Sequence, residues 1–218
     1  MKSFQELKEK YAFPRERPNV PNVGNGGMYH AENMFSHILK NNFKLILEIG
    51  VCYGECTRHI TKFCPTADIV VLDNWSCTLG SDHKPRDIFV NRLWDYRNNI
   101  SIIDGDSKSG LKILSEYDIK PNLIYIDGFH SYDYVFYEVE MCYRLFPEMM
   151  ICGDDFRIDM WDKDFRMCGV DRAVMDFLNK YGQDNFNFKV YEDNSTGSWC
   201  IAPKKRMRPC KGPKIRYS

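Results

Sequence analysis

The sequence lacks the long apolar segments that membrane insertion and secretion require. No apolar run approaches the ~18 residues of a membrane-spanning helix, and residues 1–10 are charged, without the apolar core of a signal peptide. There is also no internal repeat. We therefore expect a soluble cytoplasmic protein with no membrane contact.

The cysteines lack the spacing of a zinc site or of a disulfide framework. There are nine, an odd number, no two of them form a CxxC pair, and the closest pair is Cys52 and Cys56. Several lie in apolar stretches, where a thiol behaves as a small hydrophobic group, among them Cys52, Cys142, Cys152 and Cys200. This usage indicates a reducing, intracellular compartment.

The chain has no overall excess of charge, but its charges are unevenly distributed. It contains 30 basic and 30 acidic residues, and seven of the basic ones follow Pro203 with no acid among them. The rest of the chain is therefore acidic, which disfavours broad nucleic-acid binding by the folded domain. We expect N-terminal helices with a lid loop over 1–43, one domain over 44–203, and a flexible basic tail over 204–218, which is the one candidate nucleic-acid contact.

Apolar runs of strand length alternate with helical patterns, which is typical of an α/β fold with a doubly wound, mostly parallel sheet. The stretch from Pro14 to Gly27 is rich in proline and glycine and indicates a loop or a mobile lid, and a loop is also expected over 157–167. Expected strands cover 45–49, 69–72, 100–103, 123–126 and 149–152, with a closing hairpin of 188–191 and 199–202 through Asn194 and Gly197. Expected helices cover 4–11, 30–40, 55–63, 86–96, 108–115, 131–145 and 170–181.

Carboxylates follow two of the expected strands. Asp127 comes directly after strand 123–126, and Asp154 and Asp155 come shortly after strand 149–152. Ligands of an open α/β sheet collect at the carboxyl ends of its strands, so these side chains are expected to converge. Oxygen ligands suit Mg²⁺ or Mn²⁺ better than zinc, although helix caps and turn formers are the alternative interpretation.

A glycine-containing turn follows the first expected strand, in the segment from Glu48 to Gly54. It is not the G-x-G-x-x-G fingerprint of dinucleotide binding, and Glu48 would repel a pyrophosphate and attract a cationic ligand. Asp73 ends the next strand, just over twenty residues after Gly50, where a carboxylate can accept hydrogen bonds from ribose hydroxyls. A nucleoside with a positive tail and no phosphate is S-adenosylmethionine.

The segments LEIGVCYGECTRHI, VVLDNWS, IIDGDS, YIDGFHSYDYVFYEVEMCYRLF and MMICGDDF resemble the successive motifs of class I S-adenosylmethionine-dependent methyltransferases. The pair DGxHSY and GDD resembles, more narrowly, the macrocin and novobiocin type of metal-dependent sugar O-methyltransferases. The resemblance covers roughly residues 44–156. It implies a seven-stranded sheet whose last hairpin contributes an antiparallel strand.

The resemblance also implies roles for individual residues. The metal ligands would be Asp127, Asp154 and Asp155, and Asp73 would bind the ribose. The methionine and ribose region would be lined by Glu48, Gly50, Tyr53 and Gly54, and Asp106 with Ser107 would lie near the adenine.

One position departs from the pattern of that family. Some of its members carry a second acid two residues after the first metal ligand as a general base, and this chain has Phe129 there. His130 is the nearest replacement, because a neutral imidazole can accept a hydroxyl proton at neutral pH. We therefore expect Asp127 and His130 to be catalytic, with a capping or packing histidine as the alternative for His130.

The expected reaction is Mg²⁺-assisted methyl transfer to a hydroxyl of a sugar or glycan, with a vicinal diol as the acceptor. A catechol is the second choice, RNA is an alternative that rests on the basic tail, and a non-catalytic nucleoside-binding subunit is the alternative of another class. Tyr132, Tyr134 and Trp161 could form an aromatic wall for the acceptor, although such residues more often belong to the core. The sequence leaves the oligomeric state open, including a homo-oligomer.

Overall fold

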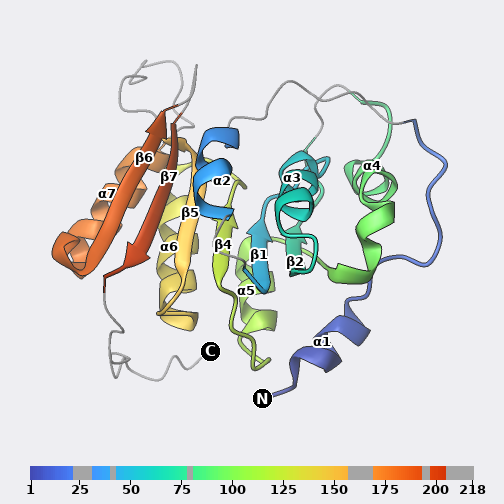
Figure 1. Ribbon diagram of the computed structural model, residues 1–218, viewed down its shortest axis with the longest axis horizontal. Coiled ribbons are helices and arrows are strands. Elements are labelled where there is room, and N and C mark those ends of the chain that lie inside the picture. Colours follow the sequence, from blue (N-terminus) through green and yellow to red (C-terminus); the bar gives the residue numbers. More distant parts are fainter. Residues whose placement is uncertain (22–30, 40–42, 78–80, 157–168, 193–196, 205–218) are drawn as a thin grey trace.

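A seven-stranded sheet with helices on both faces forms the body of the protein (Figure 1). The computed structural model describes residues 1–21, 31–39, 43–77, 81–156, 169–192 and 197–204. The strand order is β3-β2-β1-β4-β5-β7-β6. Neighbouring strands are parallel from β3 to β5, and β7 is antiparallel to both β5 and β6. The doubly wound sheet and its antiparallel strand are thus confirmed.

The central strands are apolar almost throughout because helices cover both of their faces. Residues of β1 alternate between two cores: Ile46 belongs to the core under α2, α3 and α4, and Leu47 to the core under α5, α6 and α7. The strands are β1 (Leu45–Ile49), β2 (Asp68–Asp73), β3 (Ile100–Asp104), β4 (Leu123–Ile126), β5 (Met150–Phe156), β6 (Phe186–Glu192) and β7 (Gly197–Pro203). The helices are α1 (Phe4–Lys10), α2 (Glu32–Ile38), α3 (Glu55–Phe63), α4 (Pro85–Arg92), α5 (Ser107–Leu114), α6 (Tyr132–Leu145) and α7 (Val170–Tyr181).

The N-terminal segment packs against the β3 side of the sheet. Ser3 and Glu6 form a capping box at the start of α1, and the side chain of Leu7 is fully buried in the core. Ala12 forms an isolated bridge with Ser101 of β3 and so covers part of an otherwise free strand edge. Of the expected lid, residues 14–21 belong to the described part, and residues 22–27 lie outside it.

Two expected elements differ in the structure. The fifth strand is longer than expected, so Asp154 and Asp155 lie within β5 and not beyond its end. Pairing with β7 extends this strand through an irregular register between Gly153 and Phe156, and Asp155 has a positive φ of 57°. The helix expected over 86–96 is divided into α4, which ends at Arg92 with Leu93 as its C-cap, and the 3₁₀ turn η2 (Trp94–Asn99).

Other expectations are confirmed in part or lie outside the description. The helix expected over 30–40 is observed as the shorter α2. The described residues exclude His30, Trp161, Asn194, the loop expected over 157–167 and residues 205–218 of the basic tail. None of the helices in the described ranges combines the length and the apolar character needed to cross a membrane.

Candidate active site

The turn after β1 and the loop after β4 touch at the carboxyl edge of the sheet. Gly50 has a φ of 81°, and a Cβ placed on it would lie 2.3 Å from the carbonyl oxygen of Asp127 and 2.4 Å from the Cα of Gly128. A glycine is therefore required here both for the backbone conformation and for the close approach. This contact places the turn after β1, which was predicted to bind the cofactor, directly beside the acidic residues that follow β4.

Asp73 organises this turn from the end of β2. Its Oδ2 accepts hydrogen bonds from the backbone N–H groups of Val51, at 2.7 Å, and Cys52, at 2.9 Å. Its Oδ1 accepts from the backbone N–H of Trp75. A carboxylate offers about four acceptor positions, so these bonds leave room for a hydroxyl group of a ligand.

Glu48 is a buried carboxyl group beneath the turn. Its side chain is fully buried, and neither carboxylate oxygen has a hydrogen-bond partner among the described residues. Burial raises the pKa of Glu48 to about 8, an effect that the Asp127 and Asp73 carboxylates reinforce and that the neighbouring Thr57 hydroxyl only partly offsets. Glu48 is therefore protonated at neutral pH, and a nearby cation would favour its ionised form.

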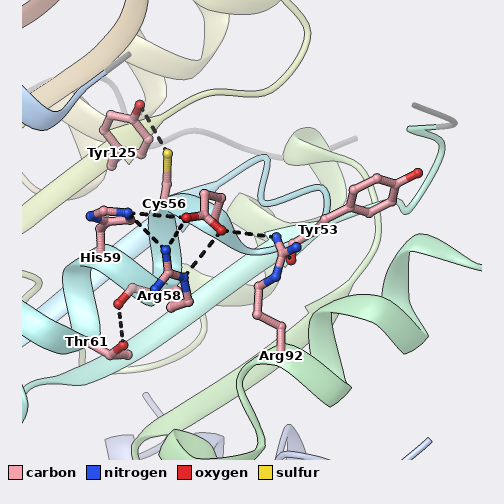
Figure 2. Close-up of polar contacts among 8 residues, drawn as sticks. Tyr53, Cys56, Arg58, His59, Thr61, Arg92 and Tyr125 are labelled. Atoms are coloured by element: carbon pink, nitrogen blue, oxygen red, sulfur yellow. Dashed lines mark hydrogen bonds and ion pairs between the residues drawn. The ribbon is translucent and has the colours of Figure 1, made fainter. Parts of the chain in front are cut away.

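An ion-pair network fixes the turn from the other side (Figure 2). Arg92 of α4 donates from Nη1 to the backbone carbonyl of Tyr53 at 3.0 Å, and the same nitrogen lies 3.3 Å from Glu55 Oε2. Arg58 and His59, one turn along α3, contact the same Glu55 carboxylate. The Arg92 side chain is only 6% exposed, so the network holds the first residues of α3 and the end of the turn in one position.

Asp127, His130 and Asp155 form a cluster at the ends of β4 and β5. Each of the three offers one potential metal ligand atom, and these atoms all lie within 4.8 Å of one another. His130 pairs through Nδ1 with Oδ2 of Asp155, and its Nε2 lies 3.7 Å from Oδ1 of Asp127. The structure thus brings together two of the three predicted metal ligands and places the predicted base between them.

The third predicted ligand, Asp154, lies beside this cluster. It lines the same small cavity as Asp127 and His130. Its Oδ1 accepts a hydrogen bond from Ser198 Oγ of β7 at 3.0 Å, and the residue is only 7% exposed. Its role as a metal ligand stays a prediction.

The cluster concentrates negative charge in a poorly solvated place. Burial, and next the charge of Asp154, raise the pKa of Asp127 well above its usual range. Burial alone would lower the pKa of His130, but its hydrogen bond to Asp155 and the charges of Asp127 and Asp155 raise it to about 9. Such a cluster fits a divalent cation. The imidazole nitrogen would be a better ligand for a transition metal than for Mg²⁺.

Asp106 and Ser107 have structural roles that the sequence did not predict. Asp106 is the N-cap of α5, with Oδ1 accepting from the backbone N–H of Ser109 at 2.7 Å, and Ser107 is buried. Their contact with the adenine stays a prediction. Tyr132, one of the predicted aromatic wall residues, stacks on Phe136 and donates its hydroxyl to Asp176.

Glu138 of α6 is a buried carboxyl group that sequence reasoning missed. It is 2% exposed, its Oε1 lies 3.7 Å from where a Cβ of Gly128 would be, and its Oε2 has no hydrogen-bond partner in the described part of the chain. Burial raises the pKa of Glu138 to about 7. Its spacing from Val135 and Cys142 places an acid on the apolar face of the helix, and this was the signal available in the sequence.

Comparison with solved structures assigns the fold. The chain superposes on an O-methyltransferase from Bacillus cereus in complex with SAH (S-adenosylhomocysteine) with a TM-score of 0.60 and 16% identity, covering 91% of this chain and 89% of that one. A provisionally named O-methyltransferase from Klebsiella pneumoniae gives 0.60 and 16%, covering 91% and 86%. A provisionally named caffeoyl-CoA O-methyltransferase from Staphylococcus aureus gives 0.55 and 17%, covering 90% and 91%. No protein-family model and no curated protein sequence matches the chain. The fold is therefore that of the Rossmann-like methyltransferases.

Proposed function

We propose that this protein is an S-adenosylmethionine-dependent O-methyltransferase that acts with a divalent metal ion on a sugar hydroxyl. One observation carries the proposal: Gly50 contacts the backbone of Asp127. This contact sets the turn after β1, from Glu48 to Gly54, directly against the acidic cluster; we call it the nucleoside turn, because it is proposed to bind the nucleoside. Methyl transfer is an in-line displacement on an already activated electrophile, so it requires that donor and acceptor sites adjoin. The fold shared with an SAH-bound O-methyltransferase supports the cofactor.

The residues of the turn would bind and orient the cofactor. Asp73, with acceptor capacity left after its three backbone bonds, would accept from the ribose hydroxyls. Glu48 would face the cationic end of the cofactor, whose charge favours ionisation of this buried carboxyl group. In the reaction the oxygen–carbon bond forms as the sulfur–carbon bond breaks, and the acceptor hydroxyl loses its proton.

The acidic cluster would activate the acceptor. Asp127 and Asp155, with His130 and the neighbouring Asp154, would hold the metal ion, and such an ion lowers the pKa of a hydroxyl group and fixes its position. His130 would serve either as a ligand of the ion or as the base, because a neutral imidazole has only one free lone pair. The charges of Asp155 and Asp127 raise its pKa to about 9, so the role of base requires that a bound cation first displace its proton.

The proposed acceptor is a vicinal diol of a sugar. Phe129 and Tyr134 are 49% and 40% exposed, and their rings meet edge to face with centroids 5.2 Å apart. Phe129 lies two residues after Asp127, so this aromatic pair offers an apolar surface at the rim of the cluster on which the C–H face of a sugar can pack. A catechol ring could use the same surface and is the second candidate.

Thermal unfolding with and without ligands tests the cofactor class. We expect S-adenosylmethionine and SAH to raise the melting temperature, with or without Mg²⁺ or Mn²⁺, because ligand binding to the native state stabilises it. NAD serves as the control nucleotide and should have no effect. Stabilisation by NAD, with none from SAH, would overturn the assignment.

Paired carboxamide variants test the metal site. Asp127→Asn and Asp155→Asn should lose binding of Mn²⁺ in a calorimetric titration, and should lose methyl transfer to a panel of sugar diols and catechols, while keeping SAH affinity. Asp133→Asn is the matched control, because Asp133 is an exposed residue in the first turn of α6, near the cluster in sequence but outside it. Undiminished transfer after exhaustive chelation would remove the metal from the proposal.

A further inference from the structure

Two cysteines from different loops meet at the rim of the nucleoside turn. The Cys52 thiol donates to the sulfur of Cys77 at a distance of 2.7 Å. Cys52 belongs to the turn after β1, and Cys77 follows β2 by four residues. Both are half-buried free thiols, whereas the other cysteines of the described ranges, which are Cys56, Cys64, Cys142, Cys152 and Cys200, are buried.

We propose that Cys52 and Cys77 form a reversible disulfide that closes the cofactor site when the protein is oxidised. A disulfide has a sulfur–sulfur distance of about 2.05 Å, so the two thiols need to move little to form one. Their partial exposure lets a small oxidant reach them. No other cysteine pair among the described residues combines this proximity with access, because Cys152 and Cys200, which are register partners between β5 and β7, are both buried.

The position of the pair gives the bond its effect. The backbone N–H of Cys52 donates to the carboxylate of Asp73, and Cys77 lies beyond Asp73 on the other loop. A disulfide would therefore tie together the two segments that flank the carboxylate proposed to receive the ribose. It would fix the spacing of the two loops and so restrict any movement that entry of a nucleoside between them requires. This consequence rests on the proposed function, whereas formation of the bond does not.

The chemistry balances with hydrogen peroxide as the oxidant. One thiol attacks the peroxide as its thiolate, gives a sulfenic acid and releases one water, and the second thiol displaces the hydroxyl of the sulfenic acid as another water. Two sulfur atoms lose two electrons in total, which reduce the peroxide to two waters. Burial, and next the neighbouring Cys77, raise the pKa of the Cys52 thiol above its usual range, which disfavours Cys52 as the first attacking thiolate. A dithiol reductant reverses the reaction by thiol–disulfide exchange.

Peptide mapping of the full-length protein tests the bond. The reduced protein is treated with hydrogen peroxide, its remaining thiols are alkylated, and the digest is searched for a peptide pair that links Cys52 to Cys77. We expect the linked pair in the parent protein and in the control variant Cys142→Ser, whose thiol lies in the buried face of α6. Cys77→Ser should abolish it. Oxidation of other cysteines without this link would overturn the proposal.

Binding of SAH to the reduced and oxidised forms tests the effect. We expect oxidation to weaken SAH binding at least tenfold in the parent protein, dithiothreitol to restore it, and Cys77→Ser to bind equally well under both conditions. Saturating SAH should also slow formation of the link, because coupling between two events is reciprocal. A link that forms without changing SAH affinity would overturn the closing role. Failure of the reduced protein to bind SAH would instead overturn the proposed function and leave the peptide mapping as the test of the bond.

Discussion

At the scale of single residues, the buried carboxyl group of Glu48 is the most informative feature of the site. A fully buried acid with no hydrogen-bond partner among the described residues is costly in a folded protein unless it stays neutral or meets a cation. Its pKa of about 8 means that this carboxyl group is mostly neutral at pH 7. A cationic ligand would supply the missing partner, so the unsatisfied group supports the proposed binding of a positively charged cofactor.

This predicts that S-adenosylmethionine binding releases a proton. At pH 7 the sulfonium would lower the pKa of Glu48 and expel most of one proton per site. Calorimetric titrations in two buffers of different ionisation enthalpy measure the number released. SAH, which lacks the sulfonium charge, should release less, and Glu48→Gln should release none from this position. Equal heats in both buffers for the parent protein would contradict the role given to Glu48.

Asp73 is the second residue whose role can be measured directly. Asp73→Ala removes the acceptor of three backbone N–H bonds, which is also the proposed acceptor for the ribose hydroxyls, so SAH affinity should fall by about 10- to 100-fold, equivalent to the ~1.5–3 kcal/mol of hydrogen bonds to a charged group. Asp68→Ala is the matched control at the opposite end of the same strand, where the carboxylate pairs with Lys8. If both variants bind SAH as the parent does, the ribose is held elsewhere.

At the scale of elements, the site depends on the close approach of the loops after β1 and β4. Gly50→Ala would place a methyl group 2.3 Å from a backbone oxygen, at a φ of 81°. Because backbone atoms on both sides cannot yield, we expect a loss of roughly 2 kcal/mol or more in the free energy of unfolding, measured by urea denaturation.

The facing glycine provides the control for that prediction. A Cβ on Gly128 would meet its nearest neighbour, the Glu138 carboxylate, at 3.7 Å, which is ordinary van der Waals contact. Gly128→Ala should therefore cost less than 1 kcal/mol, within the usual range for a tolerated substitution. Equal destabilisation by the two variants would show that the contact between these loops does not limit stability.

At the scale of the whole molecule, buried acids make stability depend on pH. Glu138 faces Ser107 from α5 and the charge of His130 from the loop after β4, and its own helix places Cys142 beside it. Its folded-state pKa of about 7 lies above the ordinary value of 4.5. The folded protein therefore holds this proton more tightly than the unfolded chain does. This contribution to stability is complete below about pH 4.5 and is lost as the pH rises through about 7.

Replacement of this acid should flatten the pH profile. Relative to the parent, Glu138→Gln should become more stable between pH 5 and pH 8, by up to about 3 kcal/mol, since each tenfold change in proton affinity corresponds to 1.36 kcal/mol. Urea denaturation at several pH values measures the difference. Glu9→Gln, at an exposed position of α1, is the control and should leave the profile unchanged. A difference between Glu138→Gln and the parent that does not vary with pH would contradict a raised pKa.

The sequence alone determined the order and type of the elements, because local patterns carry that information. The strands 45–49 and 123–126 and the helices 55–63 and 170–181 were predicted with the bounds observed. Continuous apolar runs, Pro65 after a helix and acids after strands are properties of adjacent residues, which a single chain displays without its partners. The carboxylates at the strand ends and the acid before the glycine turn were visible for the same reason.

Tertiary structure alone decided how distant residues meet. Pairing with β7 extended β5 past its apolar run and placed Asp154 against Ser198. The approach of two loops brought Cys52 to Cys77, and α4 brought Arg92 to the turn after β1. These partners are separated by 25 to 44 residues in sequence. No local sequence pattern encodes these contacts, because they depend on how whole helices and strands pack against one another around the two cores.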